Sequence, residues 1–127
     1  MVFGVLKPKV NIPGVDVAGQ VEAVGKDVEN FQPGDEVYGD LSECGFGGFA
    51  EFVTTGSRET ILLPGDLELE SAALVEPLAV GIHAVRIADV KAGSRVLVIG
   101  AGPIGLTVAL WCRFFGAREV VVSEVAT

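Results

Sequence analysis

The chain has 127 residues, of which 50% are hydrophobic and 20% are charged, and its formal net charge is −8. So apolar a composition excludes an intrinsically disordered chain, and the acidic balance argues against nucleic acid, whose phosphates require clustered lysine and arginine. The two cysteines, Cys44 and Cys112, form neither a C-x-x-C metal spacing nor a disulfide framework, which favours a reducing, cytoplasmic compartment.

Neither secretion nor membrane insertion is expected from the sequence. The start, Met1–Val10, lacks the charged segment and long apolar run of a secretory signal. Residues 96–112 are uncharged over 17 positions, but this stretch is short for a membrane span and is interrupted by glycine and proline. We therefore expect no membrane partner.

The first region, up to about residue 70, is rich in β-strand and turn signals. Val15–Val24 alternates between apolar and small or polar residues, as a half-buried strand does. Beyond the Pro33-Gly34-Asp35 turn, the same kind of pattern predicts three short strands, at Glu36–Gly39, Phe49–Thr54 and Glu59–Leu63. Several short strands with turns between them indicate a small barrel or sandwich.

The second region has an α/β pattern. Glu70–Asp89 is apolar at helical spacing, and Pro77 is expected to divide it into two helices or to kink it. Arg95–Ile99 reads as a fully buried strand, Pro103–Phe115 as a helix and Glu119–Val122 as a second buried strand. Elements of these lengths predict one βαβ unit, whose strands pair in parallel.

A glycine-rich loop joins the first of these strands to the helix. The sequence VLVIGAGPIGLTVAL places Gly100, Gly102 and Gly105 in a G-x-G-x-x-G pattern, with Pro103 and Ile104 between the last two glycines. The pattern is weak alone, but here it follows a buried strand directly and opens a helix. The first glycine permits a tight turn, the second lets the backbone approach a pyrophosphate, and the third lets the helix pack closely on the strand. Because the helix start also attracts phosphates, the loop is predicted to bind a dinucleotide.

An acidic residue, Glu124, follows the second strand 19 positions after Gly105, close to the spacing of the acidic ribose ligand in dinucleotide-binding folds. Its carboxylate can accept hydrogen bonds from the adenosine ribose and would repel a 2′-phosphate, which favours NAD while leaving NADP possible. The alternative is structural: a glycine-rich turn that packs a helix against a strand, with Glu124 as a solvated strand end.

Four stretches of the chain, read together, carry a resemblance to a known family. They are PGVDVAGQVEAVGKDVENFQPGDEVYGD (residues 13–40), GGFAEFV (47–53), EPLAVGIHAV (76–85) and VKAGSRVLVIGAGPIG (90–105). In content and order they resemble the medium-chain alcohol dehydrogenase and quinone reductase superfamily. The resemblance implies a mixed β and α/β fold: a GroES-like catalytic domain portion over residues 1–75, then the start of a Rossmann doubly wound parallel sheet over residues 76–127.

The same resemblance implies a fragment of an NAD(P)-dependent oxidoreductase that transfers a hydride between nicotinamide and a small alcohol, carbonyl or enone substrate. Family members are longer and often homo-oligomeric, so we expect the full-length form to be an oligomer. The fragment alone is expected to be inactive and prone to aggregation, because a two-stranded start of a larger sheet leaves apolar edges unpaired.

The resemblance is divided on zinc. Zinc-dependent members carry a His-Glu pair where this chain has Val15 and Asp16, and the connection Asp40–Gly48 is too short for their four-cysteine structural zinc lobe. Conversely, Glu76 matches a zinc-associated glutamate of polyol and threonine dehydrogenases. Since a catalytic zinc needs about three protein ligands, we favour the absence of zinc and keep Glu76 as the one candidate ligand.

Three other functions stay open: a zinc-free quinone or enoyl reductase-type enzyme, a non-catalytic dinucleotide-binding remnant, and a purely structural β domain with a fused βαβ piece. No catalytic residue is assigned. Glu76 could simply be a favourable first-turn acid of a helix. His83, the only histidine, is expected to be packed or to lie beside the cofactor, and Cys44 and Cys112 are expected to be unreactive.

Overall fold

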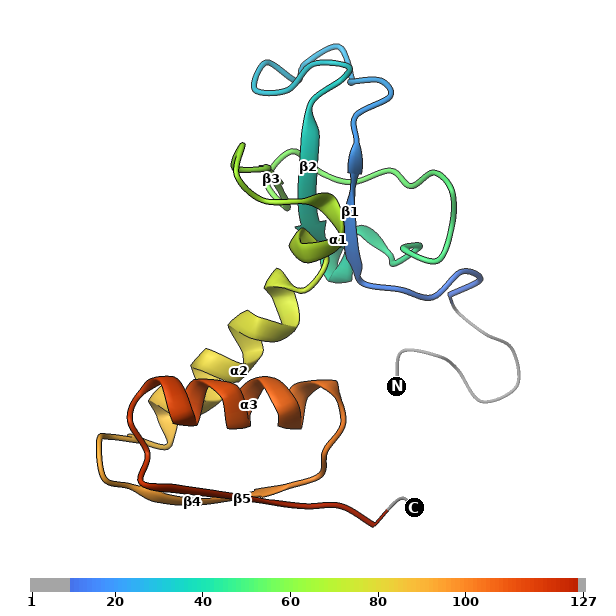
Figure 1. The fold of residues 1–127 in the computed structure, drawn as a ribbon. Coiled ribbons are helices and arrows are strands. Elements are labelled where there is room, and N and C mark those ends of the chain that lie inside the picture. The colour runs from blue at the N-terminus through green and yellow to red at the C-terminus, as the bar shows by residue number, and fades with distance from the viewer. Residues whose placement is uncertain (1–9, 126–127) are drawn as a thin grey trace. The chain divides into compact units, whose positions relative to one another are not determined.

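The computed structural model describes residues 10–125 and divides the chain into two units, Met1–Leu74 and Val75–Thr127 (Figure 1). Most of the N-terminal segment considered above for a secretion signal, residues 1–9, lies outside the described residues. Each unit has its own sheet, antiparallel in the first and parallel in the second. The assignment of these units to the two predicted domains stays a prediction.

The sheet of the first unit has three antiparallel strands in the order β1-β2-β3. Asp16 lies opposite Asp40, and Val37 lies opposite Leu62. Val37 is also one of the buried residues of this unit, so its side chain lies on the inward face of the strand. The strands run over Asp16–Gln20 (β1), Glu36–Asp40 (β2) and Thr60–Leu62 (β3).

The predicted turn before β2 is present. The N–H of Gly34 donates to the Val21 carbonyl at 2.8 Å, and the N–H of Val21 donates to the Asp35 carbonyl at the same distance. Gly34 has a φ of +97°, a left-handed conformation that glycine adopts without a Cβ penalty. The turn therefore sets the register in which β2 returns beside β1.

One predicted strand, Phe49–Thr54, is wrong: this segment has no strand structure. The backbone of this segment crosses the chain at Pro13 and does not pair along a strand. At the crossing, the N–H of Phe49 donates to the Pro13 carbonyl at 2.9 Å. The crossing is so close that a Cβ on Gly14 would lie 2.7 Å from that same nitrogen. Phe49 and Phe52 are 79% and 74% exposed, so the alternation of FAEFVT does not correspond to a buried face. A short 3₁₀ helix, Ser42–Cys44 (η1), was not predicted.

The expected division of the long apolar helical segment is confirmed, although the break comes before Pro77. The two helices are Leu69–Ala72 (α1), in the first unit, and Val75–Ile87 (α2), in the second. Pro77 is the third residue of α2, where its lack of an N–H removes no intrahelical bond.

The second unit contains the predicted strand, helix and strand after α2: Arg95–Ile99 (β4), Pro103–Phe114 (α3) and Glu119–Ser123 (β5). β4 and β5 pair in parallel, and α3 lies along one face of the pair (Figure 1). The indole N–H of Trp111 in α3 donates to the Leu78 carbonyl of α2 at 2.8 Å. This bond and the buried side chains of Val85 and Cys112 join the two helices.

The prediction that both parallel strands are fully buried is wrong for this chain. Val98 is buried on the side that faces α3, but Leu97 and Ile99 are 61% and 85% exposed. Val121 of β5 is also 49% exposed. Within residues 10–125 the sheet is thus covered on one face only, and an apolar face is open to solvent. No helix among these residues is long and apolar enough to cross a membrane.

Candidate functional site

The glycine-rich loop begins where β4 ends. The N–H of Gly100 donates to the Ser123 carbonyl at 2.7 Å, so the first loop residue still pairs with β5. Gly100 then takes a φ of +100°, which turns the chain away from the strand and requires glycine. This is the tight turn predicted for the first glycine of the pattern.

The third glycine lies against the first. A Cβ placed on Gly105 would overlap the carbonyl oxygen of Gly100 and lie 3.6 Å from Cγ1 of Val98. Backbone atoms cannot move out of the way as a flexible side chain can. Gly105 therefore allows the first turn of α3 to pack directly on the end of β4.

The second glycine, unlike the third, has no close neighbours. A Cβ on Gly102 would meet nothing within 4 Å, so the space over this residue is open. Gly102 is the N-cap of α3, with Pro103 following at the first helical position and Ile104 42% exposed. No side chain among the described residues caps this helix end. The first-turn N–H groups have no partner inside the helix, and the open space over Gly102 leaves room for an anion beside this helix end.

Glu124 lies against the same loop. Its Oε2 atom accepts a hydrogen bond from the N–H of Ala101 at 2.7 Å, and its Oε1 atom accepts one from the N–H of Val125 at 2.6 Å. The structure therefore brings together all six residues that the sequence predicts for a dinucleotide: Gly100, Gly102, Pro103, Ile104, Gly105 and Glu124. The sequence spacing placed Glu124 near the loop, but it gave no signal for the bond to Ala101.

The metal candidates are divided between the two units. Glu76 is half-buried in the first turn of α2, in the second unit, whereas Val15 and Asp16 belong to the first unit. Among residues 10–125 no group of three or more histidine, cysteine, aspartate or glutamate residues could hold a metal ion. The described residues therefore do not fit a catalytic zinc, and the role of Glu76 as a ligand stays a prediction.

The other singled-out residues divide by burial. His83 is exposed, so the interpretation of a packed core histidine is wrong, and its place beside a cofactor stays a prediction. Cys112 is fully buried, and this burial raises the pKa of its thiol, as expected for a structural cysteine. Cys44 is half-buried, and its Sγ accepts a hydrogen bond from the N–H of Gly56 at 3.4 Å.

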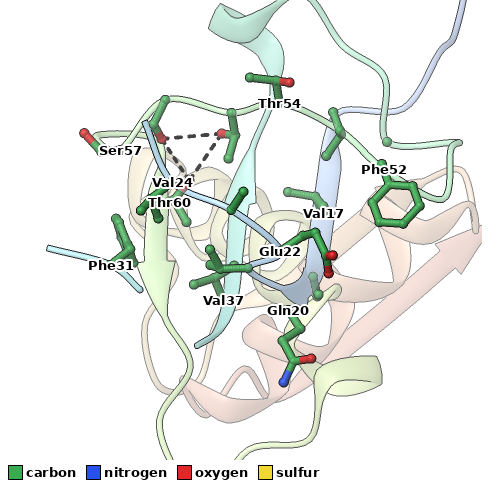
Figure 2. Close-up of a pocket in the computed structure, with 18 of the residues that line it drawn as sticks. Val17, Gln20, Glu22, Val24, Phe31, Val37, Phe52, Thr54, Ser57 and Thr60 are labelled. Atoms are coloured by element: carbon green, nitrogen blue, oxygen red, sulfur yellow. Dashed lines mark hydrogen bonds between the residues drawn. The ribbon is translucent and has the colours of Figure 1, made fainter. Parts of the chain in front are cut away.

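The first unit contains an open pocket of about 650 Å³ that the sequence did not predict (Figure 2). Val17, Phe31 and Val37 contribute to its largely apolar wall. Its polar corner is internally satisfied, because the hydroxyl of Thr60 donates to the Gly56 carbonyl at 2.8 Å and lies 3.2 Å from Oγ1 of Thr55 (Figure 2). Groups that already bond one another offer little to a polar ligand, so the pocket has the character of an uncovered core.

The chain is similar to several known dehydrogenases, among them two curated proteins and one protein with a crystal structure. (R,R)-Butanediol dehydrogenase of Saccharomyces cerevisiae is 51% identical over 80 residues, which are 63% of this chain and 21% of that protein. Sorbitol dehydrogenase of Bos taurus is 36% identical over 149 aligned positions, covering 98% of this chain and 41% of that protein. The crystal structure of a putative zinc-binding dehydrogenase from Sinorhizobium meliloti bound to NADP superimposes with a TM-score of 0.75 at 29% identity, over 87% of this chain and 39% of that one.

These matches also show how much of its relatives' length the chain covers. It corresponds to about two fifths of the length of sorbitol dehydrogenase. Since the 149 aligned positions exceed its 127 residues, the relative has at least 22 residues within the matched region that this chain lacks. The family model of the alcohol dehydrogenase GroES-like domain matches residues 2–65, half of the chain. The chain therefore belongs to the alcohol dehydrogenase GroES-like family, within the medium-chain dehydrogenase/reductase superfamily.

Proposed function

We propose that this chain is part of an NAD(P)-dependent oxidoreductase of the alcohol dehydrogenase type, and that its second unit is the start of a Rossmann domain that binds the dinucleotide. One observation carries the proposal. The open, uncapped start of α3 at Gly102 adjoins the carboxylate of Glu124, which follows β5 and accepts the N–H of Ala101 in the same loop. These are the two groups that a pyrophosphate and an adenosine ribose require.

The residues of the loop have separate roles in this proposal. The space over Gly102 admits the pyrophosphate close to the backbone, and the first-turn N–H groups, including that of Ile104, bind its oxygens. Pro103 starts the helix with a residue whose missing N–H was not needed there. Glu124 accepts hydrogen bonds from the ribose hydroxyls. When bound, the nicotinamide supplies the carbon that accepts or returns the hydride.

The cofactor is proposed to be NAD in preference to NADP. Glu124 is exposed, and its carboxylate faces the loop at which the adenosine ribose would lie, so a 2′-phosphate there would meet a like charge. NADP stays possible, because a dehydrogenase that is 29% identical to this chain is bound to NADP.

The substrate is proposed to be a small alcohol or its carbonyl product, because the matched relatives are a butanediol and a sorbitol dehydrogenase. No step of the proposal depends on zinc, since the described residues do not hold a ligand set. A zinc-free quinone or enoyl reductase-type enzyme is the alternative, favoured by Val15 at the expected ligand position. The chain's internal shortfall of at least 22 residues would accommodate a missing zinc lobe at Asp40–Gly48.

Calorimetric titration of NAD into the 127-residue chain tests the proposal, with zinc content measured on the same sample. Gly102→Ala is the informative variant, because its methyl group touches no protein atom and occupies the space left for the pyrophosphate. We expect it to fold normally and to lose about tenfold in affinity, about 1.4 kcal/mol. Gly65→Ala is the matched control, since a Cβ there also meets nothing within 4 Å. A flat titration of the folded parent chain, or equal affinity of all three proteins, contradicts the proposal.

A further inference from the structure

The carboxylate of Glu124 is already bonded to backbone in the ligand-free chain. Oε2 accepts the N–H of Ala101, which lies 23 positions earlier in the sequence, at 2.7 Å. Oε1 accepts the N–H of the adjacent Val125 at 2.6 Å. Ala101 is the second residue of the loop between β4 and α3, so the end of β5 is linked to this loop by an ionised side chain. Hydrogen bonds to a carboxylate are about twice as strong as bonds between neutral groups.

This bond restrains the N–H of Ala101, in the middle of the glycine-rich loop. Ala101 stands between Gly100 and Gly102, neither of which has a side chain that could pack and fix the peptide. A Cβ on either glycine would meet nothing within 4 Å, so both are held through their backbone alone. The Gly100 carbonyl lies against Gly105, and the Gly102 carbonyl accepts the N–H of Leu106 at 3.0 Å. The restraints on this stretch from β5 are the Gly100 N–H to the Ser123 carbonyl and the Ala101 N–H to Glu124.

The N–H groups of the loop fall into two sets, those bonded to the end of β5 and those at the start of α3. Those of Gly100 and Ala101 are directed to β5. The next residue, Gly102, is the N-cap of α3, which begins at Pro103, and this helix end has no side-chain cap among the residues described. An anion at this end would thus meet N–H groups from Gly102 onward, whose direction depends on the orientation of the Ala101 peptide.

We infer that Glu124 is a positioning residue for the glycine-rich loop, in addition to its proposed contact with ribose. Its carboxylate fixes the Ala101 peptide and so directs the following N–H groups toward the place of an anion. The statement about the loop stands by itself, whereas its consequence for pyrophosphate rests on the proposed function. It follows that Glu124 contributes to the binding of ligands that have no ribose at all.

Two substitutions separate this role from the effect of charge. Glu124→Gln and Glu124→Ala remove the same negative charge, but the glutamine keeps one oxygen that can accept the Ala101 N–H. The NH₂ group of the glutamine would then face the N–H of Val125. Because Val125 is 96% exposed, this N–H can bond to water instead. Alanine keeps no acceptor. A difference between the two variants therefore reports the lost acceptor.

The experiment measures amide hydrogen exchange of Ala101 by NMR in the ligand-free 127-residue chain. We expect the Ala101 amide to exchange about tenfold faster in Glu124→Ala than in the parent, which corresponds to about 1.4 kcal/mol. The exchange rate in Glu124→Gln should lie between those of the parent and Glu124→Ala. Glu119→Gln is the matched control, because it removes a carboxylate at the other end of β5 that pairs with Arg95 at 2.5 Å. The control should leave Ala101 unchanged.

Binding of inorganic pyrophosphate provides the second readout, because this ligand has no ribose. The inference predicts lower affinity in Glu124→Ala than in Glu124→Gln, two variants that have lost the same negative charge and differ in the acceptor for the Ala101 N–H. Equal exchange at Ala101 in the parent and both variants overturns the inference, as does an unprotected Ala101 in the parent. Protection that follows the order Glu, Gln, Ala in a chain that binds neither pyrophosphate nor NAD supports the positioning role and contradicts the proposed function.

Discussion

Gly81 of α2 lies against Thr107 of α3 so closely that a Cβ on Gly81 would stand 2.6 Å from the Thr107 hydroxyl oxygen. The side chain and backbone of Thr107 thus pack directly on the backbone of α2 at Gly81. Thr107 is held in place there, because its hydroxyl donates to the Ile104 carbonyl at 2.8 Å. The helix that starts at the glycine-rich loop is therefore packed through a glycine, as the loop itself is.

Gly81→Ala is accordingly predicted to destabilise the second unit, although alanine is the better helix former. Overpacking costs about 1–3 kcal/mol, and the gain in helix propensity is about 1 kcal/mol, so we expect a net loss of about 1 kcal/mol in the free energy of unfolding. Urea unfolding measures it. The double variant Gly81→Ala/Thr107→Ala removes the contacting hydroxyl but keeps the Cβ of residue 107, which would lie 2.9 Å away, so it should recover only part of the loss. A Gly81→Ala variant that is more stable than the parent would contradict the close packing of Gly81 on Thr107.

Gly105→Ala should behave differently from Gly102→Ala. Its methyl group would overlap the Gly100 carbonyl oxygen, which is backbone, so we expect a loss of stability of about 1–3 kcal/mol together with the loss of NAD binding. Gly102→Ala should lose binding alone. Thermal unfolding of the two variants side by side checks this, and equal melting temperatures would contradict the assigned roles of the two glycines.

The exposed face of the parallel sheet predicts concentration-dependent self-association of this chain. Leu97 and Ile99 point away from α3 and are mostly exposed, whereas Val98 points toward it and is buried. Leu97→Lys should reduce association, measured by light scattering against concentration, with little effect on stability. Val98→Lys is the contrasting control and should unfold the unit, since it places an unpaired charge in the core. Unchanged scattering in Leu97→Lys would show that another surface is responsible.

Cys112 predicts a loss of stability at high pH. Burial raises the pKa of its thiol above 9.0, so the folded state holds the proton more tightly than the unfolded state does. The associated stability is fully present below pH 9 and is lost as pH rises toward the folded-state pKa. The difference in unfolding free energy between the parent and Cys112→Ala, followed from pH 7 to 10, should shrink across this window. A difference that does not change with pH contradicts the prediction.

Glu124 predicts a change in cofactor preference. Replacing it by glutamine removes the charge that would oppose a 2′-phosphate, so NADP affinity relative to NAD should rise, by about tenfold for about 1.4 kcal/mol. Titration of both cofactors into the parent and Glu124→Gln measures the ratio. Glu119→Gln, at the far end of β5, should leave the ratio as it is in the parent.

The sequence was most informative where local signals and tertiary packing agree. Arg95–Ile99 was predicted with the bounds of β4, and α3 within one residue, because a buried strand, a glycine turn and a helix start follow one another directly. Phe49–Thr54 shows the opposite case. Its alternation is typical of a strand, but the nearby backbone of Pro13 and Gly14 crosses it and takes its hydrogen bonds. Such a crossing has no local sequence signal.

The same contrast holds for the candidate site. The spacing of Gly105 and Glu124 was sufficient to predict that the acid lies near the loop, since both follow parallel strands that end at one edge. The hydrogen bond from Ala101 depends on a single peptide orientation, and no residue pattern encodes that. Burial of the strands was overestimated, because apolar sequence indicates which face can be covered but not whether the described residues cover it.

The most direct test of the account is an NMR titration of NAD into the ¹⁵N-labelled 127-residue chain. The account predicts saturable shifts of the backbone amides of Gly102, Ile104 and Gly105, together with Ala101, while the amides around β1 to β3 remain in place. Shifts confined to the first unit, or a spectrum of the folded chain that does not respond to NAD, would contradict the claim that this loop binds a dinucleotide.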